Sequence, residues 1–182
     1  MRRIFRMILF YTLLFTGIYA AGLKLSAVQG LLFWNWVNIT AWVLILIGIF
    51  AGVIQLLLKI RNVPVKTLLI SLFSLGCISL FVLVLPLIGF AYQPEHVVIL
   101  DGKKYVARVS AFLDTDISFY EYVNPLAYKK TVRIIECYGD GAFDPIADAE
   151  KGITRDALSK HYFDENGNPE PDKTGKPDRP AD

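Results

Sequence analysis

The chain has 182 residues, of which 54% are hydrophobic and 20% charged, and its formal net charge is +2. A composition this apolar excludes an ordinary soluble domain of the same size. The charge is unevenly divided, because residues 1–91 contain seven Lys and Arg but no Asp or Glu, whereas residues 92–182 contain twelve basic and seventeen acidic residues. The small net charge is therefore a sum over two unlike halves, and it does not indicate nucleic-acid binding.

Residues 1–91 contain three apolar stretches, and we interpret this part of the chain as a membrane domain. A helix needs about 20 apolar residues to cross a bilayer. Backbone groups in hydrocarbon must be hydrogen-bonded internally, so the stretches are predicted to be helices; they cover residues 4–23, 36–58 and 67–90. The first stretch also has the basic start and the small residues, Ala20 and Gly22, of a secretory signal peptide. Cleavage after it is the alternative to the uncleaved anchor that we favour.

The distribution of Lys and Arg predicts the orientation of these spans. Residues 1–6 and 59–66 each contain three basic residues, whereas the connection at 24–35 contains one. Because short cytoplasmic loops are rich in Lys and Arg, the N-terminus is predicted to be cytoplasmic and everything after Tyr92 extracytoplasmic. The opposite orientation is the less favoured alternative. Three tryptophans suit the outer membrane interface, namely Trp34, Trp36 and Trp42.

The spans contain small residues but no charge away from their ends. Ionisable residues inside a membrane usually mark transport or proton relay, so neither activity is favoured. Small residues four apart let helices approach closely, and they occur at Gly48 with Gly52 and at Gly17 with Ala21. We expect these pairs to pack the chain's own helices, with self-association or docking on a partner helix as the alternative.

Residues 92–147 are predicted to form a small antiparallel β domain. Asp101-Gly102 is a preferred dipeptide for a two-residue hairpin turn with positive φ at both positions. Alternating apolar and polar residues predict four strands, at residues 97–100, 103–113, 117–123 and 131–139. So small a sheet needs a cover for its apolar face. The candidates are the membrane surface, the connection at 24–35, the segment 153–162 and another protein.

Residues 148–182 are predicted to be a polar, mostly disordered tail. The stretch DENGNPEPDKTGKPDRPAD contains four prolines and no large apolar residue. A short helix within residues 153–163 is also expected. The predicted fold class is thus three transmembrane helices followed by a four-stranded extracytoplasmic sheet and a disordered tail.

No pattern in the sequence predicts a catalytic, cofactor or metal site. Four aspartates that could approach a calcium ion are better explained as turn residues, namely Asp114, Asp116, Asp140 and Asp144. His96, His161 and Cys137 lack the close spacing of zinc ligands. We expect Cys137 to be a half-buried strand residue, with an intermolecular disulfide as the alternative.

An aromatic and basic segment is the candidate interaction surface. It contains Tyr120, Tyr122, Tyr128, Lys129 and Lys130. Tyrosines beside cations are typical of protein interfaces, so a partner protein or a second copy of the chain is expected there. Lipid headgroups, the sheet core and, last, a glycan are the alternatives.

The run DGKKYVARVSAFLDTDISFYEYVNPLAYKKTVRIIECYGDGAFDP, residues 101–145, resembles uncharacterised small three-span membrane proteins of Gram-positive bacteria. The resemblance implies a bacterial plasma membrane, and it carries no activity and no site residues. We therefore expect a non-enzymatic multi-pass membrane protein that serves as an accessory or interaction subunit. A sensor of an envelope ligand is the alternative, and a membrane-anchored enzyme is third.

Overall fold

A computed structural model describes residues 2–170 of the chain. The chain divides into two compact units. We call residues 1–25 and 36–91 the helical unit, and residues 26–35 and 92–182 the sheet unit. The short connection between the first two helices therefore belongs to the sheet unit. Residues 171–182, the last part of the predicted tail, lie outside the described residues.

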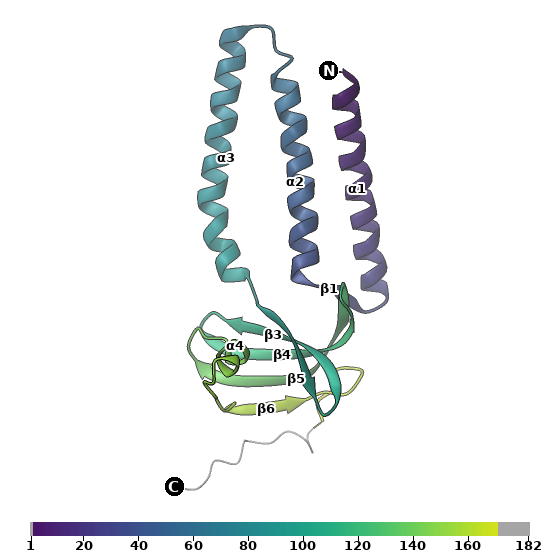
Figure 1. Ribbon diagram of the computed structural model, residues 1–182, viewed down its shortest axis with the longest axis vertical. Coiled ribbons are helices and arrows are strands. Elements are labelled where there is room, and N and C mark those ends of the chain that lie inside the picture. Colours follow the sequence, from purple (N-terminus) through teal and green to yellow (C-terminus); the bar gives the residue numbers. More distant parts are fainter. Residues whose placement is uncertain (1, 171–182) are drawn as a thin grey trace. The chain divides into compact units, whose positions relative to one another are not determined.

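The helical unit consists of three long helices (Figure 1). Their bounds are α1 Arg2–Val28, α2 Asn35–Leu57 and α3 Val63–Ala91. By length and composition each is able to cross a membrane. The prediction of three long apolar helices is therefore confirmed. The structure extends α1 past the predicted end at residue 23 and starts α3 before residue 67.

A narrow seam holds α1 against α2. Residues of α1 with reduced exposure recur every three or four positions, as in a coiled coil, and include Phe5, Ile8, Thr12, Thr16 and Tyr19. On α2 only Ala41 and Ile45 are fully buried among the described residues. The hydroxyl of Tyr19 donates to Oδ1 of Asn38 at 2.9 Å, so one polar contact fixes the register of the seam.

Helix α3 touches its neighbours much less. The rings of Phe50 on α2 and Phe73 on α3 lie 5.7 Å apart, edge to face. Lys66, Phe73 and Cys77 are half-buried, and the other α3 side chains that the structure describes are exposed. Most of the apolar surface of α3 is therefore not covered by the other described helices.

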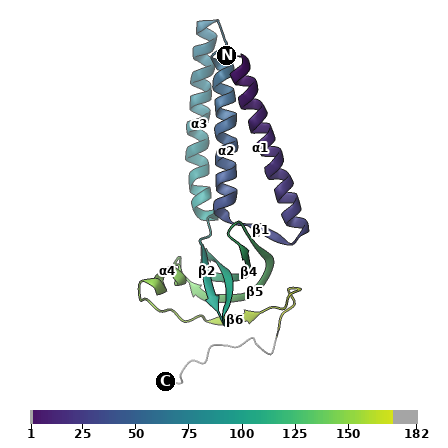
Figure 2. The same ribbon diagram turned by 45° about the vertical axis from the view of Figure 1, so that its right-hand side comes forward.

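The sheet unit is built on a curled antiparallel sheet (Figures 1 and 2). Its strands are β1 Leu31–Phe33, β2 Glu95–Leu100, β3 Lys103–Ala111, β4 Asp114–Asn124, β5 Ala127–Asp140 and β6 Ser159–Tyr162. The order is β1-β5-β4-β3-β2, and β6 also pairs with β5. Strand β1 pairs with residues 127–129 and β6 with residues 134–137.

The structure contains all four predicted strands and adds two. The Asp101-Gly102 turn is confirmed, since both residues have positive φ, +50° and +76°. Strand β1 comes from the connection at 24–35, which was predicted only as a possible cover. Strand β6 comes from the predicted tail. The four-stranded prediction therefore missed the two strands that lie beside β5.

The predicted disorder of the tail needs correction over residues 148–170. Helix α4, Pro145–Glu150, is capped by Asp144, whose carboxylate accepts from the backbone N–H groups of Ile146 and Ala147. The expected helix at 153–163 is absent from the described chain, since residues 153–158 are irregular and β6 follows them. A bridge between Phe163 and Pro169 closes a further turn.

The core lies on one face of the sheet. Its fully buried members come from β3, β4 and β5, namely Ala107, Val109, Ile117, Phe119 and Ile134. Ile146 of α4 and Tyr162 of β6 pack against them. Of the covers considered for the apolar face, the chain's own C-terminal segment thus supplies a part.

Candidate interaction surfaces of the sheet unit

The second face of the sheet carries a polar and aromatic group that we call the junction cluster: Trp34, Asn35, Glu95, Tyr120, Tyr122 and Tyr128. Its centre is the carboxylate of Glu95, the first residue of β2. Oε2 of Glu95 accepts from the backbone N–H of Asn35 at 2.7 Å, and Oε1 accepts from the hydroxyl of Tyr128 at 2.9 Å. Both carboxylate oxygens are therefore engaged in structural hydrogen bonds.

Glu95 accepts a hydrogen bond from the first backbone N–H group of α2. The first N–H groups of a helix have no intrahelical partner, and a negative charge is favourable there. Residues 1–91 contain no Asp or Glu, so a carboxylate cap for α2 can come only from further along the chain. The side chain of Asn35 also donates to the carbonyl oxygen of Gln93 at 2.8 Å. Two segments that are 58 residues apart in sequence are thus bound together.

Aromatic rings surround this carboxylate. Trp34 is 7% exposed, and its ring lies 5.7 Å from Tyr128 and 6.2 Å from Tyr122, edge to face in both pairs. Its Nε1 donates to the carbonyl oxygen of Asn124 at 3.1 Å. Trp34 was predicted at the membrane interface, which stays a prediction; the structure shows that its ring packs within the sheet unit.

The prediction that Tyr128 belongs to an exposed surface is wrong, because its side chain is only 1% exposed. Burial, followed by the negative charge of Glu95 and the hydrogen bond to it, raises the pKa of Tyr128 well above its usual range. The phenol therefore stays a neutral donor. Tyr120 and Tyr122 are half-buried in the same cluster, and only Lys129 and Lys130 of the predicted surface are exposed.

Strand β2 forms an open edge of the sheet. Its only strand partner among the described residues is β3. Val97 and Ile99 of this strand are 53% and 66% exposed. An unpaired edge that carries β-branched apolar side chains readily accepts another strand, and soluble proteins usually protect such edges. This edge is the strongest candidate for a protein contact.

The acidic residues considered for calcium serve separate roles. Asp144 caps α4 and also lies 2.7 Å from Nε2 of His96. Asp114 and Asp140 face each other across β4 and β5. A hydrogen bond to Asp140, followed by burial and the charges of Asp140 and Asp116, raises the pKa of Asp114. Within residues 2–170, no group of three or more His, Cys, Asp or Glu side chains is placed to hold a metal ion.

Cys137 is half-buried in β5 and is a free thiol. Burial, followed by a hydrogen bond with Asp116, raises the pKa of the Cys137 thiol. A thiol whose pKa is raised carries less thiolate at neutral pH and reacts more slowly. The interpretation of Cys137 as a structural strand residue agrees with this environment.

The small residues of the helical unit differ from one another. A Cβ added to Gly48 would collide with the side chain of Thr12 on α1, whereas an added Cβ at Gly52 or Gly17 would meet nothing within 4 Å. Ala21 is exposed. Only Gly48 therefore lies at a close approach between helices of this chain.

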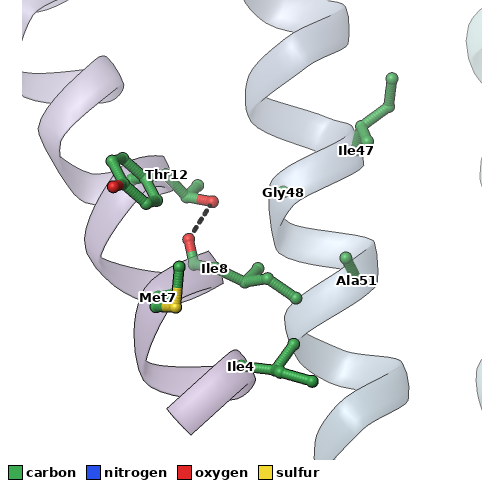
Figure 3. Close-up of a pocket in the computed structure, with 8 residues that line it drawn as sticks. Ile4, Met7, Ile8, Thr12, Ile47, Gly48 and Ala51 are labelled. Atoms are coloured by element: carbon green, nitrogen blue, oxygen red, sulfur yellow. Dashed lines mark hydrogen bonds between the residues drawn. The ribbon is translucent and has the colours of Figure 1, made fainter.

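An apolar pocket of about 430 Å³ lies beside this contact (Figure 3). Ile4, Ile8 and Thr12 of α1 and Ile47, Gly48 and Ala51 of α2 are among the residues that line it. The Thr12 hydroxyl donates to the carbonyl oxygen of Ile8 at 2.8 Å, as the dashed line in Figure 3 shows. The pocket therefore suits an apolar chain and offers no reactive group among these residues.

Comparison with protein-family models, with curated proteins and with solved structures finds no match to this chain. The functional argument rests on the geometry above. Sequence reasoning missed the cap formed by Glu95. One signal could have indicated it: Glu95 is the first acidic residue in the chain and lies four residues after the end of the third apolar helix.

Proposed function

We propose that the chain is a non-enzymatic integral membrane protein that presents its sheet unit on the extracytoplasmic side of a bacterial plasma membrane. In this role it is an accessory or interaction subunit of a membrane or envelope complex. The membrane part of the proposal is supported by three helices that are long and apolar enough to span. The orientation is supported by the Lys and Arg of residues 1–6 and 59–66.

The open edge of β2 is the observation that carries the interaction role. The strand reads EHVVIL, contains no proline, and exposes Val97 and Ile99. No other strand of the described residues pairs with its outer edge, so the outer N–H and C=O groups can form a ladder with an extended segment of a partner, while the two exposed side chains add apolar contact. We infer that β-strand addition at this edge is how the sheet unit binds a partner protein.

A photo-crosslinking residue at position 99 tests the contact. The full-length protein is purified from native membranes in mild detergent, and the same crosslinker at Ile153 is the matched control, because Ile153 is 49% exposed but lies in the irregular segment before β6. A stoichiometric protein crosslinked from residue 99 and absent from residue 153 is expected. Val97→Lys, combined with the crosslinker at position 99, should abolish that capture, because Val97 is 53% exposed on the same edge strand. Equal capture from both positions, or from neither, contradicts edge binding.

The orientation is tested separately by labelling introduced cysteines in whole cells. Asn62→Cys reports on the link between α2 and α3, and Lys103→Cys reports on the β2–β3 hairpin. The background carries Cys77→Ala and Cys137→Ser, so that no native thiol reacts. A membrane-impermeant maleimide should label residue 103 and spare residue 62. The reverse pattern means that the sheet unit is cytoplasmic.

A sensor or modulator is the second candidate, and the junction cluster favours it. Glu95 binds Asn35, the first residue of α2, and is itself part of the open edge strand. A partner on β2 can therefore change the geometry at the start of a helix. This function predicts that partner binding alters disulfide crosslinking between cysteines placed at Tyr19 and Asn38. Glu95→Gln should remove that change while the partner stays bound, and unchanged crosslinking argues for a passive accessory role.

A further inference from the structure

The β4–β5 hairpin ends in an exposed apolar tip. Val123 is 42% exposed and Leu126 is 52% exposed, on either side of Asn124-Pro125. The turn is well fixed, because Oδ1 of Asn124 accepts from the backbone N–H groups of Leu126 at 2.8 Å and of Ala127 at 2.9 Å. Such an Asx turn holds its own backbone. The two apolar side chains are therefore displayed by an ordered turn.

The same tip is hydrogen-bonded to the residue that precedes α2. The backbone N–H of Trp34 donates to the carbonyl oxygen of Leu126 at 3.2 Å. Nε1 of Trp34 donates to the carbonyl oxygen of Asn124 at 3.1 Å. Helix α2 begins at the next residue, Asn35. The tip is thus bound within one residue of the start of an apolar helix, and all of these contacts lie inside the sheet unit.

The length of α2 places its first residue close to the edge of the hydrocarbon. With a rise of 1.5 Å per residue, its 23 residues span about 34 Å. The hydrocarbon core of a bilayer is about 30 Å thick. Only a few ångströms of helix therefore extend beyond it, and Trp36, which is 52% exposed, is the kind of residue that settles at this boundary.

Exposed cations adjoin the tip. Lys129 and Lys130 follow it on β5, and the backbone N–H of Lys130 donates to the carbonyl oxygen of Gly30 at 2.8 Å. Lys129 has an acidic neighbour, Glu121, at 3.8 Å. That pair is exposed and weak, so both ammonium groups remain accessible to anions in solvent.

We propose that the β4–β5 tip enters the lipid headgroup layer, with Val123 and Leu126 at the acyl boundary and Lys129 and Lys130 at anionic lipid phosphates. The inference rests on the proposed insertion of α2, and it holds whichever side of the membrane the sheet unit occupies. It differs from partner binding at β2, because the tip is tied to the start of a membrane helix whereas Val97 and Ile99 lie on an open strand edge. The occupant of the tip is therefore lipid.

Spin-label accessibility in nanodiscs tests the depth of the tip. The full-length chain carries a nitroxide at Leu126→Cys, in a background with Cys77→Ala and Cys137→Ser, in discs that contain phosphatidylglycerol. Ile153→Cys is the aqueous control, because Ile153 has similar exposure. Leu46→Cys is the lipid control, because Leu46 is 45% exposed on α2. Molecular oxygen reports lipid exposure, and a nickel chelate reports water exposure.

The label at 126 is expected to collide with oxygen several-fold more often, relative to the nickel chelate, than the label at 153. A label at 126 that behaves like the label at 153, while the label at 46 is in lipid, overturns the inference and leaves the proposed function standing. A label at 46 that is water-exposed overturns both. In discs of phosphatidylcholine alone, the label at 126 should lie less deep. The double substitution Lys129→Gln with Lys130→Gln should remove this dependence of the depth on lipid charge. A depth that is independent of lipid charge in the unsubstituted chain overturns the role of the lysines.

Discussion

The helical unit and the sheet unit are each stabilised by different interactions. The sheet unit buries an apolar core on one face and holds a partly buried, hydrogen-bonded carboxylate on the other. In the helical unit, Ala41 and Ile45 are the fully buried side chains among the described residues, and large apolar side chains face outward along all three helices. A unit whose exterior is apolar is suited to a non-aqueous environment, and its three helices are long and apolar enough to cross a membrane. The sheet unit contains its own core, so single substitutions in that core should destabilise this unit.

The largest expected effect is that of Phe119→Ala in the sheet core. Phe119 is 3% exposed and packs in the core cluster. Loss of a buried phenylalanine side chain costs about 3–5 kcal/mol of unfolding free energy. Hydrogen exchange of the β3, β4 and β5 amides should accelerate strongly while exchange in α1 and α2 stays unchanged.

Leu113→Ala is the control for this substitution, because Leu113 is 73% exposed on the β3–β4 hairpin. We expect its effect to stay within about 0.5 kcal/mol. If Phe119→Ala also accelerates exchange throughout the helices, the two units unfold together and the contrast between them is false.

The second effect belongs to the helical unit and concerns Gly48→Leu. An added side chain at Gly48 collides with Thr12, so the α1–α2 seam must open. Overpacking of this kind costs about 1–3 kcal/mol. Thermal unfolding in detergent should show a lower midpoint, with weaker disulfide crosslinking between cysteines at Tyr19 and Asn38.

Gly52→Leu supplies the comparison, because an added Cβ at Gly52 meets nothing within 4 Å. It should leave both measurements nearly unchanged in the isolated protein. Equal destabilisation by the two substitutions would mean that the seam does not run through Gly48. A loss of partner capture caused by Gly52→Leu alone would instead place a partner helix on the open side.

Features with local causes could be predicted from the sequence. The helices follow from long apolar runs, and the Asp101-Gly102 turn follows from two residues that tolerate positive φ. Strand β1 has three residues and no pattern of its own, since it exists only through pairing with residues 127–129. Strand β6 depends in the same way on residues 134–137. Pairing over such sequence distances leaves no local signal.

The burial of Tyr128 was missed for a related reason. Phe119 pairs with Ile134 and Tyr120 with Val132, so two positions on β5 oppose one position on β4. An irregularity of this kind changes which residues share a face, and the alternation of side chains cannot be followed across it. The interaction surface predicted from the sequence therefore combined buried and exposed residues. The partners of Glu95 could not be identified either, because they lie 60 and 33 residues away, although its place as the first acidic residue was a signal that it has a role.

Tyr128→Phe should have the third-largest effect on stability, and it tests the hydrogen bonds on the second face of the sheet. The substitution keeps the ring and removes the hydroxyl that donates to Glu95. Loss of a hydrogen bond to a partly buried carboxylate costs about 1–2 kcal/mol. Denaturant unfolding of the full-length protein should show this loss. In a Glu95→Gln background the loss should shrink, because the charged acceptor is already gone.

Tyr122→Phe is the control for Tyr128→Phe, since it removes a hydroxyl from a half-buried ring of the same cluster. A smaller effect than that of Tyr128→Phe is expected. Full additivity of Tyr128→Phe and Glu95→Gln would show that the hydrogen bond contributes nothing to stability, and that the aromatic contacts alone hold this face.

The smallest expected effect is the pH dependence that arises from Asp114 and Asp140. The hydrogen bond to Asp140 and the charges nearby raise the pKa of Asp114 above its value in the unfolded chain. A carboxyl group whose pKa is raised by folding stabilises the fold at pH values below the pKa that it has in the unfolded chain, about 3.9 for Asp. This contribution to stability is lost as the pH rises through the pKa of the group in the folded protein. Asp114→Asn should therefore raise the melting temperature slightly at pH 7, and the gain should shrink as pH is lowered through that range.

Asp140→Asn should act alike, since either change removes the pair, and a gain that does not vary with pH would contradict the assignment. Residues 1–91 contain no Asp, Glu or His, so the distance between spin labels placed at positions 19 and 38 should stay constant across the same pH range; a change there would mean that acid sensed by the sheet unit reaches the helices.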